Sequence, residues 1–406
     1  MSPISPLGAL GPLLAALATI YLVNLFIKQP TSIGRYATID GLRGYLAFFV
    51  FLHHGTIWYF YLRTGVWQEP PSHLYNQFGQ SSVALFFMIT GFLFWTKLLE
   101  APNKPIDWGR LFVSRIMRLT PLYLFALAAV FLTVAILSHG ALVEPIWRLL
   151  LNTVRWLTFT IGGSPDLNGI RNTPTIVAGV IWSLPYEWLF YLTLPLFAWA
   201  LGRKPASRYL VLAFVGVLAV GVRHHQSMHL LAFLGGITSA FLARSPTFRA
   251  FASRPTSSLL VVAALALVVT LFQSAYKIGP MLLLMTAFSL IACGSNVFGL
   301  LTARLSYRLG DLAYGIYLLH GLILFWTMTF LLGPQQATQL SPTQHWGLLT
   351  ALSPIVVLIS TLAFHIIEQP AMKRTDAVTA WLRSTWSRRF HVEPRAQSTE
   401  RLTDSP

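Results

Sequence analysis

Four residues near the start of this 406-residue chain have side chains suited to chemistry: Asp40, Arg43, His53 and His54, in or beside an apolar run at residues 44–62. On an α-helix, Arg43 and His54 are three turns plus roughly 20° apart, so they share one face about 16 Å apart along the axis. Asp40 joins that face if the helix begins early enough, whereas His53 points roughly 100° away from His54. Ionisable groups inside a membrane cost on the order of 3 kcal/mol and normally line a wet or protein-filled cavity. The alternative is that one histidine fills a packing defect while Arg43 reaches to the membrane surface.

Each of these groups has a plausible chemical role. His54 could take a proton from a hydroxyl group, because imidazole exchanges protons near neutral pH. Asp40 and Arg43 could form a polar gate at the helix mouth, or only a salt bridge that fixes the helix start.

The composition indicates which elements must position these residues. The chain is 55% hydrophobic and only 10% charged, with a mean hydropathy of +0.61, and apolar runs recur along its whole length. We therefore expect an all-α polytopic integral membrane protein in a lipid bilayer. The net charge of +16 is better explained by the positive-inside rule than by nucleic-acid binding. The single cysteine, Cys293, excludes a disulfide framework.

We expect about ten core transmembrane helices, the first carrying Arg43 and His54, and an extra N-terminal helix at residues 7–27. The other nine core spans are expected at 82–99, 119–137 (opened by Pro121), 181–200, 209–222, 228–243, 257–273, 281–297, 309–330 and 347–367. The run at 146–161 contains two arginines and should be interfacial. Residues 7–27 lack the basic flank of a cleaved signal peptide.

The basic residues predict the orientation. Only six of the 29 Lys and Arg residues fall on the outer side: Arg63, Arg148, Arg155, Arg171, Arg223 and Lys277. Residues 1–35 form the extra helix and its linker, 36–370 the membrane domain, and 371–406 a basic cytosolic C-terminal tail. The segment at 381–390 could lie on the membrane surface.

Between Ile39 and Pro370 the chain resembles the membrane-bound acyltransferase 3 family, bacterial O-acyltransferases of surface polysaccharides and small molecules. The similar motifs are Asp40-Gly-Leu-Arg43 with His54, Phe86-Phe-Met-Ile-Thr-Gly-Phe92, Arg115-Ile-Met-Arg118 with Pro121 and Tyr123, Trp182-Ser-Leu-Pro-Tyr-Glu187, Leu309 to His320, and Glu368-Gln-Pro370. The chain departs from the family pattern at Trp188, where a second carboxylate is common, at Ala84 and at Thr90.

This resemblance implies an O-acyltransferase of the bacterial inner membrane. Acyl-CoA, most often acetyl-CoA, would be the donor substrate, with no permanently bound cofactor. The acceptor would be an extracytoplasmic hydroxyl, such as one on a cell-surface glycan. Arg115 and Arg118, three residues apart on one helical face, could hold the phosphates of the donor.

The resemblance also suggests roles for buried acidic and aromatic groups. The catalytic set would be His54, Arg43, Asp40 and Glu187. Glu187, about six residues below the outer end of its span, could bind the acceptor hydroxyl, balance a protonated His54, or be a structural partner. The motifs contain three further candidate site residues, His320, Tyr317 and Glu368.

Several alternatives stay open at this point. Direct transfer with His54 as base and a two-step route through a covalent acyl intermediate both fit the residues. A transporter or proton-coupled flippase would use the same buried groups without acyl chemistry, and a catalytically idle scaffold is a third possibility. His225 and His229 have the spacing of a zinc pair on a helix, but no acid or cysteine is near in sequence, so we expect no metal site.

Overall fold

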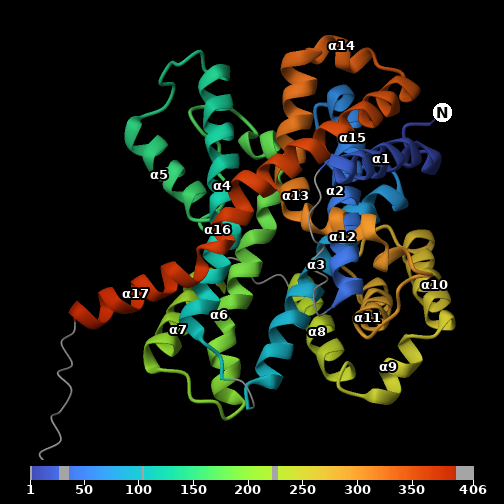
Figure 1. The fold of residues 1–406 in the computed structure, drawn as a ribbon. Helices are drawn as coiled ribbons and strands as arrows, with labels where there is room; N and C mark the ends of the chain where they lie inside the picture. Colours follow the sequence, from blue (N-terminus) through green and yellow to red (C-terminus); the bar gives the residue numbers. More distant parts are fainter. Residues whose placement is uncertain (1, 27–35, 103–104, 222–226, 390–406) are drawn as a thin grey trace, which may run out of the picture.

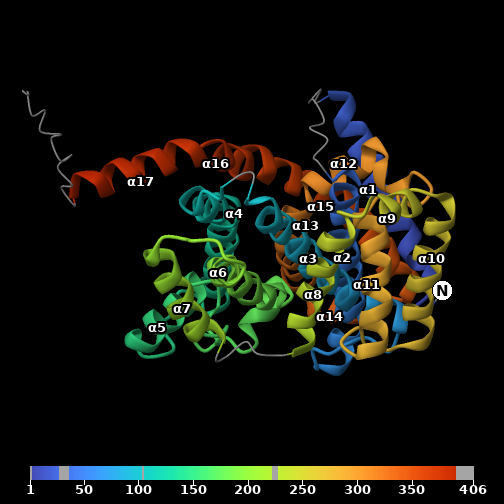
Figure 2. The ribbon, with the colours of Figure 1, turned by 90° about the horizontal axis from the view of Figure 1, so that it is seen from below.

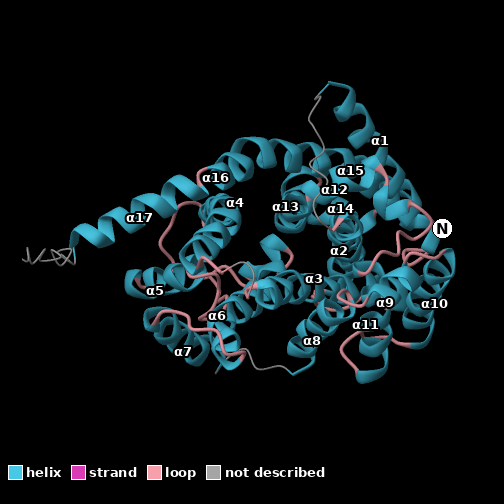
Figure 3. Ribbon diagram, turned by 60° about the horizontal axis from the view of Figure 1, so that its bottom comes forward, coloured by secondary structure: helices cyan, strands magenta, loops and turns pink. Residues whose placement is uncertain are grey.

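The structure is a computed structural model that describes residues 2–26, 36–102, 105–221 and 227–389. Across these residues the chain is helical, and its only β-type pairing is an isolated bridge between Leu167 and Ile170. In Figure 3 the described residues are coloured as helices and loops, with no strand among them. The expected all-α class is therefore confirmed.

The helices divide into an N-terminal and a C-terminal half. The first half contains η1 (Pro6–Ala9), α1 (Leu10–Phe26), α2 (Ala37–Thr64), α3 (His73–Glu100), α4 (Trp108–Leu137), α5 (Ile146–Leu157), η2 (Thr173–Val177), η3 (Val180–Ser183), α6 (Leu184–Ala200) and α7 (Ser207–Gly221). The second half contains α8 (Ser227–Leu242), α9 (Pro246–Ala252), α10 (Pro255–Leu271), α11 (Ile278–Ala292), η4 (Leu300–Thr302), α12 (Arg304–Asp311), α13 (Ala313–Trp326), η5 (Thr327–Leu331), α14 (Pro334–Gln339), α15 (Pro342–Ala363), η6 (Phe364–Glu368), α16 (Gln369–Lys373) and α17 (Thr375–Arg389).

Helices α2, α3 and α13 form the centre of the bundle. Helix α2 packs against α3, α12 and α13, while α3 packs against α8 and α13 packs against α15. Figure 1 shows these central helices between α4–α7 on one side and α1, α10 and α11 on the other. Most of α2 is buried, so the polar residues it carries face other helices or cavities and not lipid.

The start of α2 makes very close backbone contacts with η4 and α12. A Cβ added to Gly41 would lie 1.9 Å from the Leu301 carbonyl oxygen, and one added to Gly310 would lie 1.9 Å from the Asp40 carbonyl oxygen. Only glycine permits this approach. These glycines therefore fix the first turn of α2, which carries Asp40 and Arg43.

Fewer of the described helices are long and apolar enough to span a membrane than the sequence suggested. Among the described residues, five helices are long and apolar enough to cross a bilayer, or six if the bent α8–α9 pair is one span. Three of the expected spans, α7, α10 and α11, are apolar helices of only 15 to 17 residues. The ten expected core spans are therefore not confirmed, although several apolar helices support a multi-pass membrane protein.

Two helix starts differ from the predictions. Helix α4 begins at Trp108, capped by the Asp107 side chain, so Pro121 lies inside the helix and not in its first turn. Helix α6 begins at Leu184 and not near residue 181, because the chain first makes the 3₁₀ turns η2 and η3. The turns follow from backbone at positive φ at Asn172, Ala178 and Gly179, which interrupts a regular helix.

The C-terminal helices form a long extension. Helix α15 continues through the π-helical turn η6 into α16 and α17. Figure 2 shows α17 running away from the bundle past the start of α4. Arg223, which entered the charge prediction, and residue 390 of the predicted surface segment lie outside the described residues.

Candidate active site

A cavity of about 140 Å³ gathers charged residues from three helices. Arg43 comes from α2, Arg115 and Arg118 come from α4, and Glu187 comes from α6. The sequence predicted all four as site residues, and the structure places them around one space. The cavity has three cationic side chains and one carboxylate, so it suits an anionic ligand. We call it the arginine cavity.

A larger cavity of about 620 Å³ adjoins the arginine cavity. The two share Leu93, Phe94 and Arg115 as lining residues. Asp40 lines the larger cavity and Arg43 lines the arginine cavity, while Asp40 Oδ1 accepts a hydrogen bond from Arg43 Nη2 at 2.7 Å. Each of these two side chains is 28% exposed, so the predicted ion pair stands at the boundary between the cavities.

Arg118 and Arg115 have different surroundings. The Arg118 guanidinium donates to Met372 Sδ at 3.1 Å and lies 4.0 Å from a carboxylate oxygen of Glu368, whose side chain is fully buried. Both Glu368 oxygens lack a hydrogen-bond partner. The Arg115 guanidinium lies 5.2 Å from the centre of the Phe94 ring. Glu368 is thus placed to hold Arg118 in position, and not to line either cavity.

Glu187 lies at a different depth from the one predicted. It is the fourth residue of α6, in the first turn, where its carboxylate accepts a hydrogen bond from the Tyr191 hydroxyl. The sequence predicted about six residues of the same helix before Glu187. This was wrong because residues 181–183 belong to the 3₁₀ turn η3 and α6 begins only at Leu184. The same shift puts Glu187 in the arginine cavity and Trp182 in a separate cavity with His54. Glu187 is therefore placed to balance the arginines, not to meet an acceptor beside His54.

His54 contacts His320, which the sequence had singled out only by its position in a motif. His54 Nδ1 and His320 Nε2 are 3.0 Å apart, and the residues come from α2 and α13, 266 positions apart. The two rings are stacked, with their centroids 5.1 Å apart. His320 is fully buried, whereas His54 retains some exposure.

The hydrogen bonds determine which nitrogen of each ring carries a proton. His320 Nδ1 lies 2.8 Å from the Ile316 carbonyl oxygen, which can only accept, so His320 Nδ1 carries the proton. In neutral His320, Nε2 then accepts from His54 Nδ1–H, which also lies 3.0 Å from the Val50 carbonyl oxygen. His54 Nε2 consequently has a free lone pair, as a general base or nucleophile requires.

His53 has a structural environment. Its Nδ1 lies 2.7 Å from the Tyr75 carbonyl oxygen, and its ring packs over Gly79 of α3. The ring also reaches the cavity beside His54. As the helix geometry indicated, His53 and His54 have different neighbours, and only His54 contacts His320.

The cavity at His54 includes residues that the sequence analysis missed. It measures about 270 Å³, and Glu69, Gln80 and Tyr276 line it beside His54. Trp67 stacks near the His54 ring, with centroids 6.3 Å apart. The loop from Gly65 to Ser72 brings Trp67 and Glu69 there. The sequence feature that could have indicated this loop is its position as a short connection between two long helices. Such a connection must cross the mouth of the bundle.

Tyr317 lies between the arginine cavity and the cavity at His54. It lines both the arginine cavity and the cavity at His54, as does Val83. Its hydroxyl donates to the Val180 carbonyl oxygen at 2.9 Å and lies 2.8 Å from Ser183 Oγ. The two cavities therefore adjoin at a fixed tyrosine one helical turn from His320.

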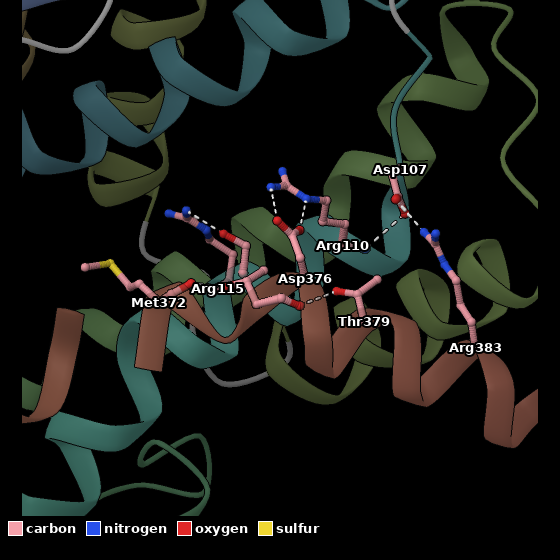
Figure 4. A network of polar contacts seen from close by, with 9 residues as sticks. Asp107, Arg110, Arg115, Met372, Asp376, Thr379 and Arg383 are labelled. Carbon is pink, nitrogen blue, oxygen red and sulfur yellow. Dashed lines mark hydrogen bonds and ion pairs between the residues drawn. The ribbon is translucent and has the colours of Figure 1, made fainter. Parts of the chain in front are cut away.

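A surface network attaches α17 to the start of α4 (Figure 4). Arg110 Nε donates to Asp376 Oδ1 at 2.6 Å, and Arg383 pairs with Asp107. Burial raises the pKa of the Asp107 carboxyl, but the Arg383 guanidinium and the Arg110 backbone N–H outweigh this effect, so its pKa lies below the ordinary value. This network holds α16, with Met372, against Arg118.

In the part of the chain that the structure describes, no three His, Cys, Asp or Glu side chains form a group that could hold a metal ion. His224 and His225 of the histidine spacing lie outside that part.

Comparison with known proteins settles the family. A family model described as an acyltransferase domain matches residues 36–365. The chain belongs to the acyltransferase 3 family. This acyltransferase is also 26% identical over 386 residues to Acyltransferase MdmB from Streptomyces mycarofaciens, covering 85% of the chain and 94% of the relative. No solved structure matches the chain. The chain is therefore an acyltransferase, and neither comparison supports the transporter alternative.

Proposed function

We propose that this enzyme is an inner-membrane O-acyltransferase that moves an acyl group from cytosolic acyl-CoA to a hydroxyl of an extracytoplasmic acceptor. The observation that carries the proposal is the position of His54. His54, whose Nε2 carries no proton, lines a cavity that adjoins the arginine cavity at Tyr317 and Val83. A donor on one side and an acceptor on the other can thus meet at one base.

Donor binding rests on the arginine cavity and its larger neighbour. Acyl-CoA carries phosphates, and guanidinium groups bind phosphate oxygens through paired N–H donors. Arg115 lines both spaces, while Arg43 and Arg118 line the inner one. We propose that the phosphates lie toward the larger cavity and that the acyl group points inward. Acetyl is the acyl group we propose, as the commonest in the family.

The acyl transfer needs one proton to move. The acceptor O–H gives its proton to His54 Nε2 as its oxygen attacks the thioester carbonyl carbon. The new C–O bond forms, the C–S bond breaks, and the protonated His54 returns the proton to the departing CoA sulfur. His320 Nε2 stabilises the imidazolium by accepting from its Nδ1–H. In the alternative two-step route, the lone pair of His54 Nε2 attacks the thioester first and gives a covalent acyl-His54 intermediate.

The orientation of the chain supports separate access to the two cavities. Figure 2 shows α16 and α17 along one side of the bundle, with α5 and α14 toward the opposite side. By the positive-inside rule, the side that carries the basic helix α17 is cytosolic. The acceptor, which we propose is a cell-surface glycan, then reaches His54 from the outside.

Mass spectrometry of extracted surface glycans and small molecules tests this function. Cells with the active protein should contain a species heavier by one acyl group, and cells lacking the protein or carrying His54→Ala should not. Identical spectra from all three strains would refute the proposal. An acyl shift that persists in the His54→Ala strain would refute the role of His54.

A further inference from the structure

The cavity beside His54 has polar and aromatic groups that the donor does not need. We call it the outer vestibule, defined by His54, Glu69, Gln80, Trp182 and Tyr276. These residues come from α2, α3, η3 and the loops after α2 and α10. Both loops follow helices whose starts are basic, with Arg43 in α2 and Arg254 at the N-cap of α10, so we infer that the vestibule faces away from the basic end.

The carboxylate in the vestibule is held in place by an amide that is itself fixed. Gln80 Oε1 accepts from Ser274 Oγ at 2.7 Å and from the Ala275 N–H at 2.9 Å. Gln80 Nε2 in turn donates to Glu69 Oε1 at 2.5 Å. This leaves the other carboxylate oxygen of Glu69 available to a ligand. A fixed carboxylate is a strong acceptor for hydroxyl donors.

A buried hydroxyl in the same cavity lacks a partner. The Tyr276 hydroxyl is buried and makes no hydrogen bond in the structure. Buried polar groups are nearly always hydrogen-bonded, so an orphan at a cavity wall points to a ligand or water that completes it. Tyr276 can donate to, or accept from, a hydroxyl group.

The aromatic wall offers a flat apolar face next to these polar groups. Trp182 is 37% exposed, unlike most of the large aromatic residues nearby, and its indole lies 4.8 Å from the His229 ring behind it. Trp67 covers the His54 ring from the loop side. An aromatic face beside hydrogen-bonding groups suits a ring that has an apolar face and polar edges.

The charge of the vestibule limits what it can bind. Of the described residues that line it, none is Lys or Arg, and Glu69 is its only carboxylate. An anionic acceptor would meet a like charge with no cation to balance it. The charge therefore favours neutral or cationic ligands.

We propose that the outer vestibule is the acceptor subsite and that it takes a sugar ring without negative charge. Glu69 and Tyr276 bind ring hydroxyls, Trp182 packs on the ring face, and one hydroxyl lies at His54 Nε2. This assignment rests on the proposed function, because it places the acceptor of that reaction. It makes Glu69, Gln80 and Tyr276 specificity-determining residues.

Two measurements test the proposal with the full chain in lipid nanodiscs. The first is saturation-transfer NMR binding of three probes without donor: methyl glucopyranoside, glucosamine and the methyl glycoside of glucuronic acid. The second is acetyl transfer from acetyl-CoA to the same probes. The variants are Glu69→Gln, Glu69→Lys and Tyr276→Phe. Glu144→Gln, a carboxylate outside the cavity, is the matched control.

We expect the neutral and cationic probes to bind at least tenfold more tightly than the anionic one. Glu69→Gln and Tyr276→Phe should each weaken the binding of methyl glucopyranoside at least threefold and raise its KM in the transfer reaction by a similar factor. Glu69→Lys should remove the discrimination against the anionic probe, while Glu144→Gln should leave all values unchanged.

Three outcomes would overturn the assignment: no probe binds, the anionic probe binds best to the unmodified protein, or the Glu69 and Tyr276 variants bind the probes as the control does. The binding measurement also separates this assignment from the proposed function. Probe binding that responds to these variants, with neither transfer nor CoA release, would refute the acyl transfer but support the sugar site. CoA release and transfer to other hydroxyl compounds, without sugar binding, would refute only the sugar site.

Discussion

The contact between His54 and His320 leads to a quantitative prediction for His320→Leu. Leucine has a similar size and fills the buried site, but it cannot accept the His54 Nδ1–H. The Val50 carbonyl oxygen, 3.0 Å from the same nitrogen, remains as the second acceptor. The tautomer with a free Nε2 is therefore weakened but not lost.

The expected size of this effect follows from the lost hydrogen bond. A neutral hydrogen bond contributes about 0.5–1.5 kcal/mol net, which corresponds to about 2- to 13-fold in rate. Removal of the base itself is more severe, because a positioned general base contributes about 10²–10⁴-fold. We therefore expect kcat to fall about 2- to 13-fold in His320→Leu and at least about 10²-fold in His54→Ala.

The assay is initial-rate acyl transfer per folded molecule, with detergent thermal unfolding as the check on folding. The KM for acyl-CoA should stay the same in His320→Leu, because His320 does not line the arginine cavity. A His320→Leu variant with the rate of the unmodified enzyme would refute the orienting role. A variant as inactive as His54→Ala would show that His320 takes part in the chemistry directly.

Three further predictions concern the arginine cavity and α17. Replacing both Arg115 and Arg118 with Gln should raise the KM for acyl-CoA at least tenfold, while the variant still inserts into the membrane normally. Arg63→Gln is the control. An unchanged KM for acyl-CoA in the double variant would show that Arg115 and Arg118 do not bind the donor. Glu187→Gln should lower kcat strongly while the thermal midpoint in detergent changes little, whereas a large loss of stability with normal activity per folded molecule would mark it as structural. Asp107 has a lowered pKa, so its ion pair stabilises α17 docking above the unfolded pKa and is lost as pH falls through the lower folded value. Protease cleavage near α17 should therefore increase below about pH 4 in the unmodified protein, and Asp107→Asn, which keeps the helix cap, should show that cleavage already at pH 7.

Part of the site could be predicted because it lies within one helix. The period of an α-helix placed Asp40, Arg43 and His54 on one side of α2, and the structure keeps them on a single 28-residue helix. The pair of His54 with His320 could not be predicted, since it depends on how α2 packs against α13. Close contacts between elements far apart in the sequence, such as Gly41 of α2 against Leu301 of η4, are likewise invisible in the periodicity of a single helix.

The errors have local physical causes. The depth of Glu187 was wrong because the apolar run at 181–200 begins with a 3₁₀ turn, which apolar composition does not distinguish from an α-helix. The ten core spans are not confirmed, because three of the apolar runs form helices of only 15 to 17 residues, shorter than a typical membrane span. Glu69 escaped attention because an exposed carboxylate in a loop has no sequence feature that connects it to His54.

The central claim is that His54 moves an acyl group from CoA to a hydroxyl across two adjoining cavities. Its most direct test uses proteoliposomes with the basic end outward, acetyl-CoA supplied only outside and methyl glucopyranoside only inside. We predict an acetylated sugar inside and free CoA outside in equal amounts, and neither product with His54→Ala. Product that forms only when both substrates are on the same side, or that forms equally with His54→Ala, would contradict the account.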